Sequence, residues 1–149
     1  MIDPKVGYIP STSMKELVRD NSVLLPVISR FAIPFGFGDS SVEKACDEAG
    51  VDTATFLSVC NLLSHYPYSR EGVSLPSLMN YLRRAHSSIL TFQLPRIRHH
   101  LIEAINSADS HGIVLMLIKF FDNYVAEVKR HLEHENEVVF SYVESLLDG

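Results

Sequence analysis

The chain has 149 residues, of which 46% are hydrophobic and 21% are charged, and its formal net charge is -5. This length is enough for one good hydrophobic core or two small ones. The acidic balance and the lack of a basic stripe argue against a nucleic-acid partner. The first residues show no basic segment followed by an apolar run, and no apolar stretch reaches the length of a membrane span. We therefore expect no membrane association and a cytoplasmic location.

Residues 11–64 are expected to form a small N-terminal helical domain, preceded by a loosely held tail at residues 1–10. Its helices are separated by clear start and stop signals. Ser13 with Glu16, and Ser40 with Glu43, match the capping-box pattern. Four helices are predicted, at about 14–20, 23–31, 41–49 and 53–64, with Pro34, Gly36 and Gly38 in the loop after the second, Gly50 after the third and Asp52 capping the fourth.

A linker at 65–74 is expected to separate this domain from a second domain at 75–149. The second domain reads as a long antiparallel hairpin of two helices, at about 75–106 and 110–147, with Ser107 or Asp109 as the cap between them. Apolar residues recur at intervals of three and four, which predicts an all-α chain. Pro95 removes one backbone hydrogen bond from the first long helix, where the apolar seam also shifts, and predicts a kink there.

The two cysteines, Cys46 and Cys60, lie on separate predicted helices. In a reducing compartment they are expected to be buried thiols and not a disulfide. The chain contains no Gly-rich phosphate loop, nucleophile elbow or Cys-x-x-Cys pair, so the sequence names no catalytic residue and leaves open whether the protein is an enzyme.

A candidate metal site lies in the second long helix. His131 and Glu135 are one helical turn apart inside an otherwise apolar seam that also contains Tyr124 and Val138. A carboxylate buried without a partner costs several kcal/mol (about 3–5). A cation shared with His131 would offset that cost, because residues at i and i+4 can reach one ion.

A third candidate ligand lies on the first long helix, where His86 interrupts a stripe that includes Leu82 and Ile89. If the two helices are antiparallel neighbours, His86, His131 and Glu135 can point into one core. The competing interpretation is that His131 and Glu135 form an exposed ion pair. Of the other histidines, His134 is expected on the flank, His99 and His100 on a solvated face, and His111 facing away.

Three segments together resemble the repair of iron centres family, the ScdA/YtfE-like di-iron proteins. They are MKELVRDNSVLLPVISRFAIPFGFGDSSVEKACDEAGVD at 14–52, RRAHSSILTFQLP at 83–95 and HLEHENEVVF at 131–140. That family joins a short helical domain to a hemerythrin-like four-helix bundle. The resemblance implies that His86 and His131 are terminal iron ligands and that Glu135 bridges two irons. It also implies a non-haem di-iron protein that repairs iron-sulfur clusters damaged by nitrosative or oxidative stress, with iron donation as the expected route.

Three departures from the family pattern stand out. Gly36 and Phe37 occupy the loop where the family usually has a Cys-Cys pair, so the resemblance carries no thiol chemistry to that loop. His86 precedes Pro95 by nine residues, where the pattern has about eight. The sequence contains two bundle helices where the family has four. A twofold homodimer would supply four helices, four His and two Glu, so we expect either such a homodimer or a shortened form of a longer protein.

Two other functions remain open. A hemerythrin-like protein that binds oxygen or nitric oxide typically has a His-x-x-x-His pair, which this sequence lacks. A metal-free helical module for protein interaction would use His131 and Glu135 only as a mutually satisfied pair. If the chain is a di-iron repair protein, its expected partners are damaged iron-sulfur proteins and a second copy of the chain.

Overall fold

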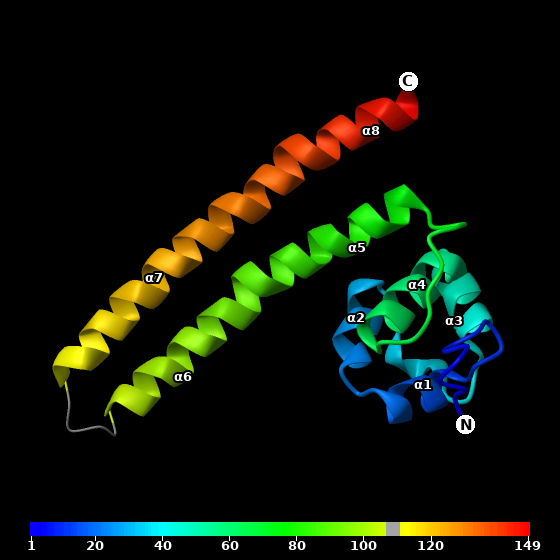
Figure 1. Cartoon of the computed structure of the whole chain (residues 1–149), viewed down its shortest axis with the longest axis horizontal. Coiled ribbons are helices and arrows are strands. Elements are labelled where there is room, and N and C mark those ends of the chain that lie inside the picture. Colours follow the sequence, from blue (N-terminus) through cyan, green and yellow to red (C-terminus); the bar gives the residue numbers. More distant parts are fainter. Residues whose placement is uncertain (107–110) are drawn as a thin grey trace. The chain divides into compact units, whose positions relative to one another are not determined.

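The computed structural model describes residues 1–106 and 111–149, and these confirm an all-α fold (Figure 1). In chain order the elements are α1 (Met14–Asp20), α2 (Leu24–Arg30), the 3-10 turn η1 (Phe35–Phe37), α3 (Val42–Ala49), α4 (Thr53–Leu63), α5 (Leu75–Ser88), the π-helical turn η2 (Ile89–Gln93), α6 (Leu94–Asn106), α7 (His111–His134), the π-helical turn η3 (Glu135–Val139) and α8 (Phe140–Asp148). Over the described residues there is no β-strand, only an isolated bridge between Ser13 and Ser41. The expected caps Ser107 and Asp109, and the side chain of His111, lie outside what the structure describes.

The chain divides into two compact units, Met1–Leu82 and Arg83–Gly149. The division falls inside α5, so residues 65–74, expected as a linker, belong to the first unit. This segment is non-helical and is bonded to α4. The Ser58 hydroxyl donates to the carbonyl oxygen of Ser69 at 2.7 Å, and the N–H of Ser74 donates to the Thr55 hydroxyl oxygen at 2.8 Å.

The helix starts in the first unit follow capping chemistry. The hydroxyl of Ser13 accepts the N–H of Glu16, and the Asp52 carboxylate accepts the N–H of Thr55, as predicted. The predicted cap Ser40 is wrong by one residue, because Ser41 caps α3. The reason is the bridge to Ser13, which holds Ser41 in extended backbone and starts the helix one residue later.

The core of the first unit gathers apolar side chains from α1 to α4 and from the start of α5. Phe31 stands at its centre, edge-on to Phe56 at 5.3 Å and stacked on Tyr81 at 4.6 Å between ring centroids. Each fully buried side chain of this kind contributes about 1.5–3 kcal/mol. Cys46 and Cys60 are buried and free, which confirms the prediction. Burial raises the pKa of the Cys46 thiol to about 11 and raises that of Cys60 further, so both stay protonated.

The N-terminal tail is not loosely held, and that expectation is wrong. Tyr8 is buried, its N–H donates to the side-chain oxygen of Asn61 at 2.7 Å, and the Asn61 amide returns a bond to the Tyr8 carbonyl at 3.0 Å. The Tyr8 hydroxyl donates to Asp20 at 2.6 Å. Burial and the Asp20 carboxylate raise the pKa of Tyr8, which keeps this donor protonated. These bonds fasten the tail to α1 and α4.

The second unit is a hairpin in which the end of α5, from Arg83 onward, η2 and α6 run antiparallel to α7, η3 and α8 (Figure 1). Each side of the hairpin is one long helix interrupted by a single π turn. None of the described helices combines the length and apolar character that crossing a membrane requires.

The tail gives a first testable prediction at Gly7, whose φ is +76°. A Cβ there would lie 2.5 Å from the Asn61 side-chain oxygen. Gly7→Ala should therefore lower the free energy of unfolding by about 1–3 kcal/mol. Gly36→Ala is the matched control, because a Cβ there meets nothing within 4 Å. Urea unfolding followed by circular dichroism measures both, and equal midpoints would show that the tail is not docked as described.

Candidate metal site

Three predicted ligands, one from each of three elements, meet in the second unit. His86 lies near the end of α5, His131 near the end of α7, and Glu135 begins η3. The Nε2 atom of His86 lies 3.3 Å from Glu135 Oε2, and the Nε2 atom of His131 lies 3.1 Å from Glu135 Oε1. The structure therefore brings together all three residues that the sequence singles out.

Each imidazole faces a different oxygen of one carboxylate. Two donors bound about 2.1 Å from a first-row divalent ion, at an angle of about 90–105°, lie about 3.0–3.3 Å apart. The two N–O separations at Glu135 fall in this range. A carboxylate whose two oxygens serve separate imidazoles also has the donor arrangement that a bridge between two ions needs.

Asn136 orients His86 from its other side, because its side-chain oxygen lies 2.8 Å from His86 Nδ1. An amide oxygen accepts, so this contact assigns a proton to Nδ1. The Nε2 atom, facing the carboxylate, then carries either a second proton or a shared cation. An outer partner on one imidazole nitrogen is the usual way in which proteins fix the other as a metal ligand.

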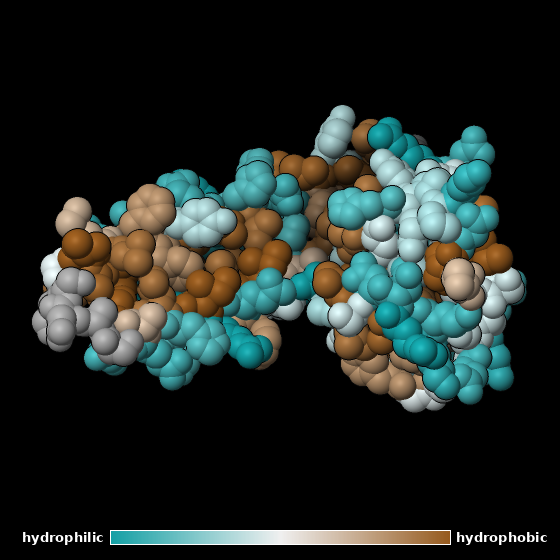
Figure 2. Space-filling model, turned by 60° about the horizontal axis from the view of Figure 1, so that its bottom comes forward, coloured by the Kyte–Doolittle hydropathy of each residue, from teal (hydrophilic) through white to brown (hydrophobic). Residues whose placement is uncertain are grey.

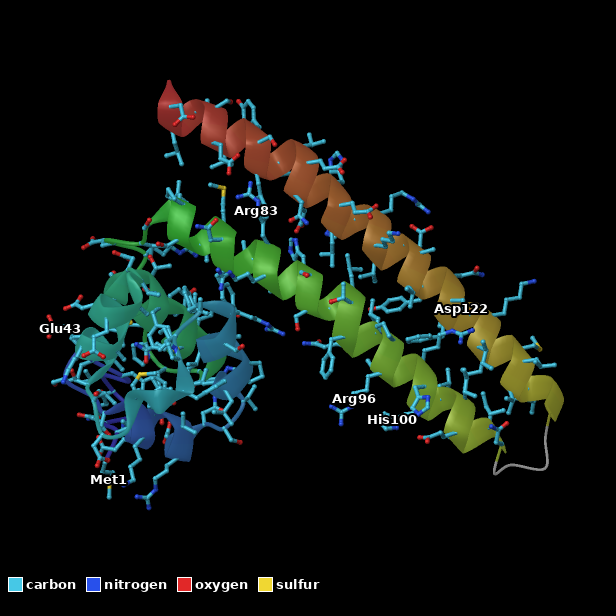
Figure 3. The ribbon with its side chains drawn as sticks, turned by 180° about the vertical axis from the view of Figure 1, so that it is seen from behind. Met1, Glu43, Arg83, Arg96, His100 and Asp122 are labelled. Atoms are coloured by element: carbon cyan, nitrogen blue, oxygen red, sulfur yellow. The ribbon has the colours of Figure 1, made fainter. Side chains whose placement is uncertain are left out.

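An aromatic ring holds His86 in place. Phe140 stacks on the imidazole with 5.7 Å between ring centroids and 12° between ring planes. The guanidinium of Arg83 lies 5.3 Å from the Phe140 centroid and donates to Glu144 on α8 at 2.7 Å. Figure 3 shows Arg83 extending from α5 toward the opposite helix. These contacts leave His86 only 5% exposed.

His131 is placed differently from what the sequence pattern predicts. The side chain of His131 is 71% exposed, whereas that of Glu135 is 33% exposed. The expectation that His131 lies in a buried seam is therefore wrong for a single hairpin. Tyr124, Val138 and Tyr142, predicted in the same seam, are exposed as well. The buried positions are their neighbours, including Leu132. One side of the site is therefore packed and the other is open.

The donor set fits a non-haem metal. Imidazole nitrogen and carboxylate oxygen suit iron, zinc and similar ions, and there is no thiolate to favour softer ones. Among the described residues, no group of three or more His, Cys, Asp or Glu side chains is already arranged to hold an ion. The present side chains instead contact one another in pairs. An ion would take the place of the protons between imidazole and carboxylate, which is the ordinary coupling of metal binding to proton release.

Three further histidines of the hairpin, His99, His100 and His134, are exposed. His99 and His100 face Glu103 at 3.3 and 3.2 Å, which confirms the expected solvated face; His100 is labelled in Figure 3. The sequence argument missed both Asn136 and Arg83. Asn136 directly follows Glu135, and Arg83 lies three residues before His86. These positions next to the predicted ligands are the signal that could have identified both residues.

Comparison with protein-family models, with characterised proteins and with solved structures finds no match for this chain. The site therefore stands on its own geometry.

A second prediction tests the aromatic support of His86. Phe140→Ala removes a side chain that is 6% exposed, and it should destabilise the hairpin by about 3 kcal/mol. Val139→Ala is the control, since Val139 is 42% exposed, and it should cost less than about 1 kcal/mol. Hydrogen–deuterium exchange measures both changes locally. Faster exchange at 83–95 and 131–148 is expected only for Phe140→Ala, and equal protection in the two variants would contradict the assignment.

Proposed function

We propose that this chain is a non-haem iron protein whose centre is built on His86, His131 and Glu135. The observation that supports the proposal is the convergence of both imidazole Nε2 atoms on opposite oxygens of one carboxylate. A bound iron pair would supply Lewis-acid and redox chemistry at this place. His86 and His131 would be terminal ligands, and Glu135 would bridge.

The chain's own residues each have a role in this proposal. Asn136 holds the Nδ1 proton of His86 and so keeps Nε2 directed at the carboxylate. Phe140 covers the His86 ring and excludes water from that side. The exposed ring of His131 leaves a route by which an ion can enter or leave. One firmly held ligand and one accessible ligand suit a centre that exchanges its metal.

Such a centre supports a role in repairing iron-sulfur clusters damaged by nitrosative or oxidative stress, with iron donation as the mechanism. This role also rests on the resemblance of residues 83–95 and 131–140 to the repair of iron centres family. The partners would be damaged iron-sulfur proteins as clients and a second copy of the chain.

A metal-free interaction module is the second candidate, and one observation favours it. Each oxygen of Glu135 already has an imidazole nitrogen within 3.3 Å, and protonated imidazoles at these places would pair with the carboxylate, so the hairpin does not need an ion to avoid an unpaired carboxylate. In that case the function would lie in the surfaces of the two units.

Substitution of the bridging carboxylate separates the two candidates. Glu135→Gln removes the charge but keeps the shape, so it should lower iron affinity at least about tenfold. Glu133→Gln is the matched control, because Glu133 makes an exposed ion pair with Lys129 on the same helix. Iron retained after anaerobic reconstitution and gel filtration is measured by mass spectrometry. Equal retention by both variants, or none by the wild type, would reject the iron centre.

A further inference from the structure

Among the described residues of the hairpin, one side presents apolar side chains that its own two helices leave exposed. Along α7 they are Ile113, Leu117, Phe120 and Tyr124, which together with His131 we name the outer stripe. Their exposed fractions are 73% for Ile113, 71% for Phe120 and 53% for Tyr124. At 100° per residue these positions fall within about 60° of one another, beside the face that packs in the hairpin. Figure 2 shows hydrophobic residues gathered along the two long helices.

The facing helix extends this apolar side. Ile97 on α6 is 51% exposed, and in an antiparallel pair its position falls on the same side as the outer stripe. The opposite side of the hairpin carries the ion pair of Arg98 with Asp122, at 2.7 Å. The hairpin therefore has one apolar side and one charged side. From Ile113 to Tyr124 the outer stripe itself carries no charged residue.

The area is large enough for a stable contact. Covered aromatic side chains remove about 150–250 Å² each from water. The outer stripe with Ile97 offers on the order of 500 Å² per chain, and a pair of such faces reaches the roughly 1,000 Å² that specific interfaces need. The largest apolar patches on monomeric proteins reach this size, and such patches often mark interaction sites.

We propose that a second copy of this chain covers the outer stripe, and that the two hairpins form a four-helix bundle with His131 of each copy inside it. A second hairpin has the same length and an apolar side, and the charged residue along the stripe, Glu127, is already paired with Arg130 of its own helix, so two identical faces can meet about a twofold axis. Docking would bury the exposed imidazole of His131 and the half-buried Glu135. The shared centre rests on the iron proposal, whereas the docking itself does not.

The position of His131 selects the direction of the axis. A twofold axis parallel to the helices places every residue level with its own copy, so that both outer stripes overlap and both His131 side chains lie at one level. A perpendicular axis through the middle of the apolar residues, near residue 119, would separate the two His131 residues by about 35 Å at 1.5 Å per residue. Of these two axes, the parallel one allows both copies to contribute to one centre.

The docking face is tested with full-length variants by analytical ultracentrifugation at tens of micromolar. The wild type should be a dimer, and Leu117→Glu and Phe120→Glu should each weaken dimerisation at least 100-fold. Leu115→Glu is the matched control, because Leu115 is 67% exposed but lies away from the outer stripe, and it should stay dimeric. Circular dichroism verifies that all variants are helical.

The outcomes separate the two proposals. A monomeric wild type, or stripe variants that remain dimeric, overturns the docking face. Monomeric variants that keep wild-type iron overturn the shared centre. A wild-type dimer that binds no iron but is split by the stripe variants supports the docking while rejecting the iron centre.

A spin-label distance tests the axis. Ser145 is exposed on α8, and Ser145→Cys carries the label, while buried Cys46 and Cys60 resist labelling. The parallel axis predicts a distance of about 20–30 Å between labels across the bundle. The perpendicular axis predicts a distance of about 80 Å between the labels. An absence of distances below about 40 Å would therefore show that the two His131 side chains do not lie at the same level.

Discussion

The contact of Glu135 with two imidazoles is the interaction on which the second unit depends. A half-buried carboxylate is costly unless positive or donor groups surround it. His86 reaches it across the hairpin and His131 from the preceding turn of the same helix. The contact with His86 therefore helps to set the register of the two helices, together with the ion pairs Arg83–Glu144 and Arg98–Asp122 that also cross the hairpin. Apolar packing alone tolerates sliding. The same three groups that fix the register also form the donor set of the candidate metal site.

The two π turns make this contact geometrically possible. His86 and Leu94 are eight residues apart across η2, and Leu132 and Phe140 are eight apart across η3. In a regular α-helix such pairs diverge by about 80°, yet all four side chains are buried. One extra residue in each turn restores the alignment, and π turns of this kind often occur at functional sites. Pro95 is the second residue after the first π turn, where the wider turn relieves the clash that its ring would cause with the carbonyl four residues earlier.

Capping chemistry and helical periodicity predicted the helices well, because these signals are local. The seam shift near Pro95 was visible in the sequence, but the pattern could not distinguish a kink from a π turn. The predicted seam through His131 was displaced by one position, since α7 is apolar over two adjacent stripes and periodicity alone does not say which one faces the other helix. The docked tail was missed because the bonds of Tyr8 to Asn61 join residues far apart in sequence, at a segment whose composition reads as loop.

That second apolar stripe connects the fold to the proposed function. A hairpin can bury only one stripe of each helix, so a helix with two stripes is suited to a bundle of more than two helices. His131 belongs to the stripe left exposed, and Glu135 joins it to the buried His86. The ligand set is thus divided between the inner and outer faces of one hairpin. Covering the outer face would remove water from His131 and strengthen every charge interaction at Glu135, because electrostatic energies rise as the local dielectric constant falls. Assembly and metal affinity would then be coupled through a single carboxylate.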